Sequence, residues 1–178
     1  MSIIDGFIRR DREIARLEKL RLKLKPSDLR GVKLCSKCGF CCNVRTCIPT
    51  PDELKKIAKF LKLTPIQLIN KFYAIDRKWL GSDYYVKPVG VNIKDLAGKF
   101  IPSSRTYNEG KCIFLSPDNL CKIYKVRPEL ARVLKCWKKD KKQEKLDEEN
   151  YNKVMKSWEK NQLKQFGING NKLESQAK

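Results

Sequence analysis

Four of the eight cysteines lie close together in the pattern Cys-x2-Cys-x2-Cys-Cys. They are Cys35, Cys38, Cys41 and Cys42. Three cysteines at this spacing match the first three ligands of the ferredoxin run, in which a single loop wraps an iron–sulfur cluster. Zinc sites more often show paired Cys-x2-Cys knuckles separated by a spacer. Because adjacent cysteines point in different directions, Cys41 and Cys42 need not serve the same ion; one can ligate while the other packs or faces a second site. The segment therefore predicts metal or cluster binding.

Two further cysteines flank a second feature, the turn sequence Ser-Pro-Asp-Asn at 116–119. Pro, Asp and Asn favour tight turns, so the flanking apolar residues are expected to pair as two short strands. A turn at 116–119 pairs Leu115 with Leu120 and places Cys112 diagonal to Cys121, at a Cα separation of about 7–8 Å. That separation suits thiolates that reach two irons of a cluster better than two ligands of one zinc. The alternative is a small hairpin with two buried cysteines.

Composition narrows the chemistry further. The chain has 178 residues and no histidine, which excludes Ser-His-Asp and Cys-His catalysis and every zinc site that contains histidine. No apolar run approaches the roughly 18 residues of a membrane span, and the N-terminus lacks the apolar core of a signal peptide. We therefore expect a cytoplasmic protein with no membrane partner. In a reducing compartment clustered thiols act as metal ligands and not as disulfides. Cys47 is either a ligand of a second site or a small buried residue.

The elements that must position these thiols are mostly helical. Thr-Pro-Asp-Glu at 50–53 and Thr-Pro-Ile-Gln at 64–67 each place Thr at an N-cap, Pro at the first helical position and Glu or Gln at the third. Apolar residues at helical spacing follow both starts, and the second apolar face includes Phe72 and Tyr73. The two helices predict a packed helical hairpin, with a DNA-reading helix-turn-helix as the alternative. Short strands are expected around Tyr84.

The fold class predicted from these signals is mainly α with a small β-hairpin. An irregular cysteine-rich loop, organised by the metal, packs on the helical hairpin and on terminal helices. The predicted regions are an N-terminal amphipathic helix in 1–30, a cysteine-cluster metal or Fe–S domain in 31–137, and a charged C-terminal helical extension in 138–178. Within the extension, a helix around 151–158 is expected to pack on the core and the end from residue 167 is expected to be frayed.

Taken together, three stretches are similar to a known family. They are Cys35-x2-Cys38-Gly39-Phe40-Cys41-Cys42, the Thr-Pro-Asp-Glu helix start that follows, and Lys111 to Leu115 continued by Cys121 to Pro128. These residues resemble the CxxCxxCC cysteine-cluster proteins, the YkgJ-like family of zinc- or iron-chelating domains. The resemblance implies a site built from the first cluster and the later cysteines. Flagellin lysine-N-methylases are distant relatives, so redox chemistry or protein methylation follows by analogy alone.

One departure from the family concerns the segment after Arg127-Pro128. The family continues Arg-Pro-x-x-Cys-Arg, whereas this chain has Ala131 at the cysteine position. Cys136 is the nearby candidate replacement, although the two positions face different directions on a helix. Arg127 has two interpretations: a guanidinium that donates hydrogen bonds to cysteine sulfur and raises a reduction potential, or a surface arginine before a helix-starting proline.

From these observations the sequence predicts a cysteine-ligated metal protein. Its cofactor is an Fe–S cluster, of the 4Fe–4S type, or zinc, and its role is redox or protein-modifying chemistry with an unidentified protein or redox partner. The primary ligands are Cys35, Cys38, Cys42, Cys112 and Cys121, and Cys41 and Cys136 are additional candidates. The alternative is a zinc-stapled basic module that binds RNA, another nucleic acid or a protein. The sequence assigns no catalytic residue.

The net charge of +20 generates a testable prediction about nucleic acid. The basic residues are spread along the whole chain, so any binding should arise from phosphate neutralisation alone. We expect weak binding that is steeply salt-dependent and insensitive to sequence in competition assays with several DNA and RNA sequences at about 0.15 M salt. A marked preference for one sequence or structure would favour the binding-module alternative instead.

Overall fold

The computed structural model describes residues 12, 42, 47–78, 83–106, 109–133 and 141–175. Within these ranges the chain is mainly helical with a small antiparallel sheet, as predicted. The helices and strands are α3 (Pro51–Phe60), α4 (Pro65–Phe72), β1 (Tyr73–Arg77), β2 (Tyr84–Pro88), α5 (Glu129–Val133), α6 (Lys141–Ser157) and α7 (Gly170–Ser175). Short 3-10 segments are η2 (Val91–Leu96), η3 (Ser103–Arg105), η4 (Tyr124–Val126) and η5 (Gln162–Phe166). The predicted N-terminal helix and most of the cysteine-rich loop lie outside the described residues.

Both predicted helix starts are confirmed. The Thr50 hydroxyl accepts a hydrogen bond from the Glu53 amide, and the Glu53 carboxylate accepts one from the Thr50 amide at 2.8 Å. Thr64 and Gln67 repeat this capping box on α4. The turn between the helices uses Lys62 in the left-handed region, at φ 56°. The apolar faces of α3 and α4 are buried in one core, which confirms the packed helical hairpin.

The sheet begins one residue after α4 ends. We expected Tyr73 on the apolar face of the second helix, but the backbone turns extended there and Tyr73 opens β1. β1 and β2 pair antiparallel, with Tyr73 opposite Pro88 and Arg77 opposite Tyr84. The strand expected around Tyr84 is confirmed as β2. Pairing with β2 gives hydrogen bonds to backbone N–H and C=O groups that would lack partners at the end of a longer helix. These strand hydrogen bonds are more favourable than one further helical residue at Tyr73.

The segment from Cys112 to Tyr124 differs from its predicted hairpin. It forms tight turns with single bridges and no regular strand, and Leu115 lies opposite Cys121, not Leu120. Two hydrogen bonds explain the difference: the Leu115 amide turns back to the Cys112 carbonyl at 3.0 Å, and the Ser116 amide reaches the Leu120 carbonyl at 2.9 Å. The chain therefore curls before and within the turn, so the diagonal Cys112–Cys121 geometry derived from a regular ladder is wrong.

The C-terminal region closes the core against α3. In α6 and just after it, Val154, Met155 and Trp158 are buried with residues of α3 and α4, as expected for a packing terminal helix. The Trp158 indole N–H donates to the Pro49 carbonyl at 2.7 Å, across a long separation in sequence. We expected a frayed end from residue 167, but Ile168 is buried and Gly170–Ser175 forms α7.

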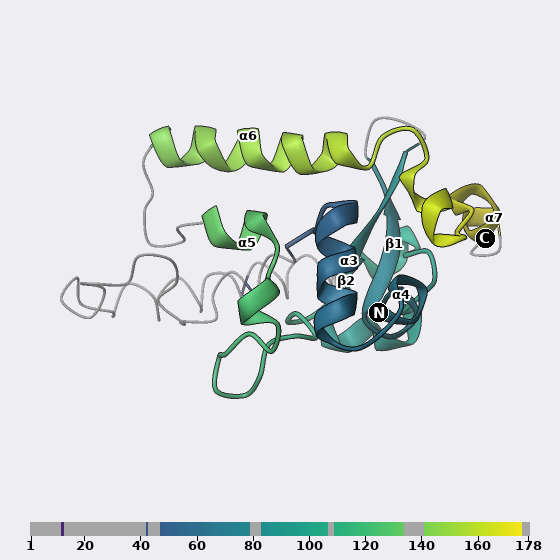
Figure 1. The fold of residues 1–178 in the computed structure, drawn as a ribbon, viewed down its shortest axis with the longest axis horizontal. Coiled ribbons are helices and arrows are strands. Elements are labelled where there is room, and N and C mark those ends of the chain that lie inside the picture. Colours follow the sequence, from purple (N-terminus) through teal and green to yellow (C-terminus); the bar gives the residue numbers. More distant parts are fainter. Residues whose placement is uncertain are drawn as a thin grey trace.

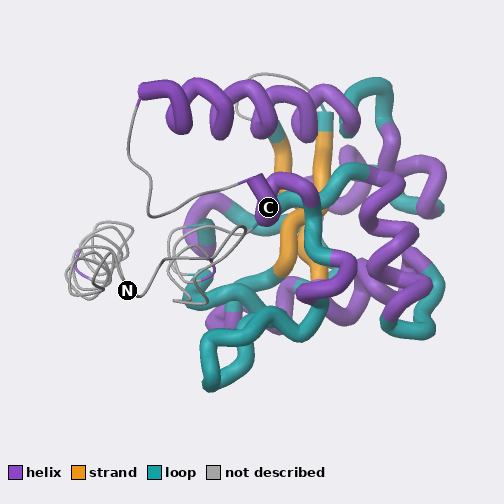
Figure 2. Tube along the Cα trace, turned by 60° about the vertical axis from the view of Figure 1, so that its left-hand side comes forward, coloured by secondary structure: helices purple, strands orange, loops and turns teal. Residues whose placement is uncertain are grey.

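The described elements surround the two strands. Figure 1 shows α6 running along one edge above α5 and α3, with α7 at the far end. In Figure 2 the strands run through the centre, with helices and loops around them. α5 contacts α6, and α3 contacts both α4 and η4. Among the helices in the described ranges, none has the length and apolar character needed to cross a bilayer.

The two capping boxes offer a matched test of how the helices are tied together. The Glu53 carboxylate accepts the Thr50 amide and also the Glu129 amide at the start of α5, at 2.6 Å, whereas a single amide hydrogen bond, from Thr64 at 2.9 Å, is found on the Gln67 side-chain oxygen. We expect Glu53→Ala to lower the free energy of unfolding by about 2–3 kcal/mol and Gln67→Ala by about 1 kcal/mol. Equal losses in denaturant unfolding would contradict the link between α3 and α5.

Candidate metal centre

Cys112 is held by the end of the sheet and by a second cysteine-bearing segment. It forms an antiparallel bridge with Gly90, just beyond β2, and the flanking Ile113 amide donates to the Val89 carbonyl at 3.0 Å. The Cys112 amide itself donates to the Cys42 carbonyl at 2.8 Å. This bond joins the doublet of the cysteine-rich segment to a cysteine seventy positions away along the chain. Two of the predicted ligand residues are therefore neighbours.

Gly90 permits this arrangement because the backbones pass at very short range. A Cβ placed on Gly90 would lie 1.8 Å from the Glu109 carbonyl oxygen. Its φ of −78° is open to any residue, so the close approach, and not backbone strain, requires glycine here. The glycine thus allows the segment that carries Cys112 to lie directly against the end of the sheet.

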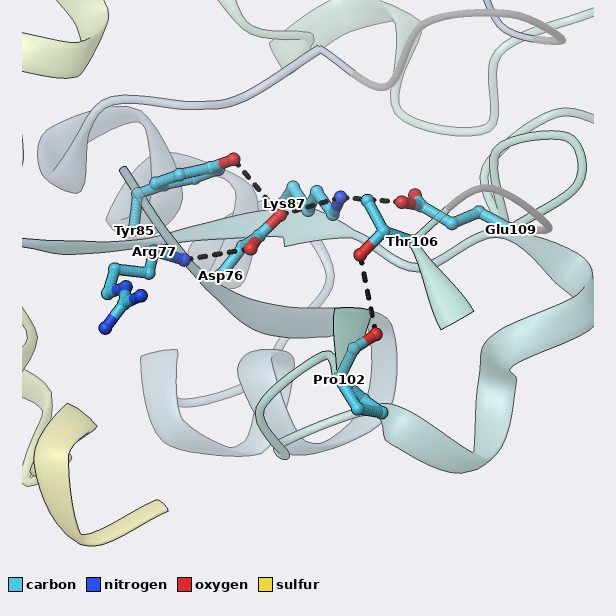
Figure 3. Close-up of polar contacts among 7 residues, drawn as sticks. All are labelled: Asp76, Arg77, Tyr85, Lys87, Pro102, Thr106 and Glu109. Atoms are coloured by element: carbon cyan, nitrogen blue, oxygen red, sulfur yellow. Dashed lines mark hydrogen bonds and ion pairs between the residues drawn. The ribbon is translucent and has the colours of Figure 1, made fainter. Parts of the chain in front are cut away.

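A buried ion-pair cluster fixes the same segment from the other side (Figure 3). Lys87 on β2 lies 2.8 Å from the Asp76 carboxylate on β1 and 2.7 Å from the Glu109 carboxylate. The Tyr85 hydroxyl donates to Asp76 at 3.1 Å. Because Glu109 lies three residues before Cys112, the cluster ties the approach to that cysteine to both strands.

The charged neighbours in this cluster shift the pKa values of Lys87 and Tyr85. Burial lowers the pKa of the Lys87 ammonium, but the carboxylates of Glu109 and Asp76 raise it by more, so its pKa lies above the ordinary value. Burial, together with the Asp76 charge, raises the pKa of the Tyr85 phenol. Lys87 therefore stays protonated and Tyr85 stays neutral throughout the physiological range. The ion pairs of Lys87 with Asp76 and Glu109 tie both strands to the segment before Cys112.

The other described cysteines lie around the same part of the core. Cys42 and Cys121 are partly buried and pack against the main hydrophobic core, to which the buried Cys112 belongs. Cys47 is partly buried and directly precedes the buried Ile48 and Pro49. The thiol groups of Cys112, Cys121 and Cys47 all contribute to the electrostatic environment of one side chain, Tyr73. Two parts of the chain, one at Cys47 and one from Cys112 to Cys121, therefore act electrostatically on that tyrosine.

Tyr73 is a residue that the sequence did not mark as functional. It is fully buried, its ring packs 5.8 Å from the Phe114 ring between centroids, and its hydroxyl has no hydrogen-bond partner among the described residues. Burial raises the pKa of the phenol well above its ordinary value, and the nearby groups of Cys112, Cys121, Glu53 and Cys47 raise it further. An unsatisfied buried hydroxyl is costly and rare in proteins.

Arg127 is buried, not exposed. Its guanidinium stacks over the Tyr124 ring at 4.3 Å from the centroid, and its backbone carbonyl accepts a hydrogen bond from Arg132 at 3.1 Å. The interpretation of Arg127 as an ordinary surface residue is therefore wrong; its predicted contact with cysteine sulfur stays a prediction. The Tyr124 ring that Arg127 covers is itself exposed, whereas Phe114 is buried.

Four of the seven predicted ligands, Cys35, Cys38, Cys41 and Cys136, lie outside the described residues, so their role stays a prediction. Ala131, which replaces the family cysteine, lies in α5. In the described ranges no three Cys, Asp or Glu side chains are already grouped as a ligand set. The backbone hydrogen bond between Cys112 and Cys42 brings two thiol-bearing residues together, and thiols suit zinc and iron.

Comparison with known proteins identifies the class to which this site belongs. Residues 34–153 match the CxxCxxCC family, described as a "Putative zinc- or iron-chelating domain". The match covers more than half of the chain, and the protein belongs to this family. Family membership supports metal binding in general.

A curated relative adds no activity. A protein of Methanocaldococcus jannaschii that is named only as uncharacterized is 34% identical over 100 residues, which are 56% of this chain and 42% of that protein. The aligned region thus spans about two fifths of the length of the relative. No solved structure matches this chain.

The close approach at Gly90 leads to a prediction about site assembly. Gly90→Ala should force the Glu109–Cys112 segment away from β2, lower the free energy of unfolding by about 1–3 kcal/mol and weaken metal binding. Gly167→Ala is the control, because a Cβ there has no atom within 4 Å and only the strain of φ +75° remains. The control should cost about 1 kcal/mol and leave the metal content of the purified protein unchanged. Equal metal contents for the two variants would show that Gly90 does not position the site.

Proposed function

We propose that the protein carries a cysteine-ligated Fe–S cluster, of the 4Fe–4S type, and serves in redox or protein-modifying chemistry. The single observation that carries this proposal is the junction of Cys42 and Cys112, whose backbones are hydrogen-bonded at 2.8 Å, beside Cys121 at the same core. Cys35 and Cys38 share a short segment with Cys42 and supply the remaining primary ligands of the proposal. When bound, such a cluster takes up and releases single electrons.

The residues of this chain define the surroundings of the centre. Phe114 and Tyr73 form an apolar wall on the core side, which lowers the local dielectric and limits the access of water. Arg127 is a buried cation in the segment after Cys121, and a positive charge near a thiolate-rich centre favours the reduced state. Cys136 and Cys41 are the candidate additional ligands, and Cys47 is either a ligand of a second site or a small buried residue.

A zinc-stapled binding module is the second candidate function. The observation that favours it is the net charge of +20, which suits a polyanionic partner or an acidic protein surface. The same thiols would then hold zinc as a structural element, and the basic surface would make the contacts. Metal analysis and visible absorbance after anaerobic purification separate the two: a brown, iron-containing protein supports the cluster, and a colourless protein with stoichiometric zinc supports the module.

Cysteine variants test the ligand assignment in either case. Cys112→Ser and Cys121→Ser should each reduce bound metal by at least about tenfold at a limiting metal concentration, because a hydroxyl is a poor ligand for these ions. Ile123→Val is the matched control: it alters a buried side chain two residues from Cys121 and leaves every thiol in place. Ile123→Val should lower the free energy of unfolding by about 1 kcal/mol and leave the bound metal unchanged. Full metal content in both serine variants would refute the assignment.

A further inference from the structure

The Tyr73 hydroxyl has no hydrogen-bond partner among the described residues, and the nearby groups of Cys112, Cys121 and Cys47 act on it electrostatically. Its side chain is completely buried, so water is not a ready partner. Phe114 packs against its ring, and Phe72 packs against Phe114 at 5.3 Å between ring centroids, so the ring is held in the core on an aromatic cluster. A buried hydroxyl without a partner carries a desolvation cost that folding alone does not offset.

The groups near this hydroxyl differ in their ability to accept a hydrogen bond from it. Both oxygens of the Glu53 carboxylate already accept backbone amides, from Thr50 and from Glu129. Neutral thiols are weak acceptors, and in the described residues none is in hydrogen-bonding geometry with the Tyr73 hydroxyl. A cysteine sulfur that binds a metal is deprotonated, and the resulting negative charge makes it a strong, charge-assisted acceptor. Metal binding would therefore create the partner that Tyr73 lacks.

We propose that the Tyr73 hydroxyl donates a hydrogen bond to the metal-bound thiolate of Cys112 and stabilises the loaded centre from the core side. Cys112 is chosen because it is the buried cysteine of the described set and belongs to the same core as Tyr73. The inference rests on the proposed metal centre and deepens it. Tyr73 is thus a positioning residue: it orients a ligand and favours the thiolate form, and does not itself bind the metal.

This role predicts effects of opposite sign in the two states of the protein. Tyr73→Phe keeps the ring and removes only the hydroxyl, so the metal-free chain should unfold at a higher denaturant concentration than the wild type, because an unsatisfied group is gone. The same variant should bind Zn²⁺ about ten- to a hundredfold more weakly in competition with a chelator, the usual effect of removing a hydrogen bond to a metal ligand. A purely structural tyrosine would move both measurements in the same direction.

Tyr85→Phe is the matched control, because its hydroxyl already has a partner in Asp76 at 3.1 Å. It should lower the unfolding midpoint of the metal-free chain, and any change in Zn²⁺ affinity should be much smaller than that of Tyr73→Phe. In iron-loaded protein, Tyr73→Phe should also shift the reduction potential to more negative values, since a hydrogen bond to sulfur raises the potential, while Tyr85→Phe should not.

The possible outcomes separate this inference from the proposed function. If the wild type and Tyr73→Phe bind Zn²⁺ with equal affinity, the inference is overturned and the metal centre stands. A Tyr73→Phe variant whose metal-free form is less stable than the wild type also overturns it. If the wild type binds neither Zn²⁺ nor iron, the proposed function fails and the inference fails with it.

Discussion

The position of Cys112 depends on two backbones that pass each other at very short range at the end of the sheet. Only a residue without a Cβ allows the Glu109 carbonyl to lie against Gly90, and the bridge from Gly90 to Cys112 then sets the cysteine beside Val89 and Cys42. Much of the described structure serves this contact. α4 leads directly into β1, β1 pairs with β2, and β2 ends at the point where the cysteine segment arrives.

Charge and burial then keep the contact in place. Lys87 lies between two carboxylates, one on β1 and one just before Cys112, and each of the three groups is largely withdrawn from water. Removing one member of such a buried network would leave an uncompensated charge, which costs several kcal/mol, so the cluster defines one arrangement of the segment. Trp158, just after α6, donates to the Pro49 carbonyl and joins the C-terminal region to the chain that leads back to Cys47.

Local signals in the sequence predicted local structure well. The capping boxes at Thr50 and Thr64 depend on residues only three positions apart, and both form as expected. A small hairpin was predicted, but its position did not follow from the sequence. Tyr73 fits a helical pattern, yet pairing with β2 makes it part of a strand, and the turn at 116–119 joins no regular pair of strands. The family could be predicted from the cysteine spacing. The role proposed for Tyr73 could not be predicted from the sequence. It depends on the hydroxyl being buried without a hydrogen-bond partner, which only the folded structure shows.

We propose that thiolates from distant parts of this chain hold one metal centre. Metal-edge X-ray absorption on the protein purified without oxygen reports the atoms bound to the metal, whether that metal is iron or zinc. We expect a shell of sulfur ligands at about 2.3 Å, with no imidazole contribution because the chain has no histidine. A shell made of oxygen or nitrogen ligands, or protein without bound metal, would contradict it.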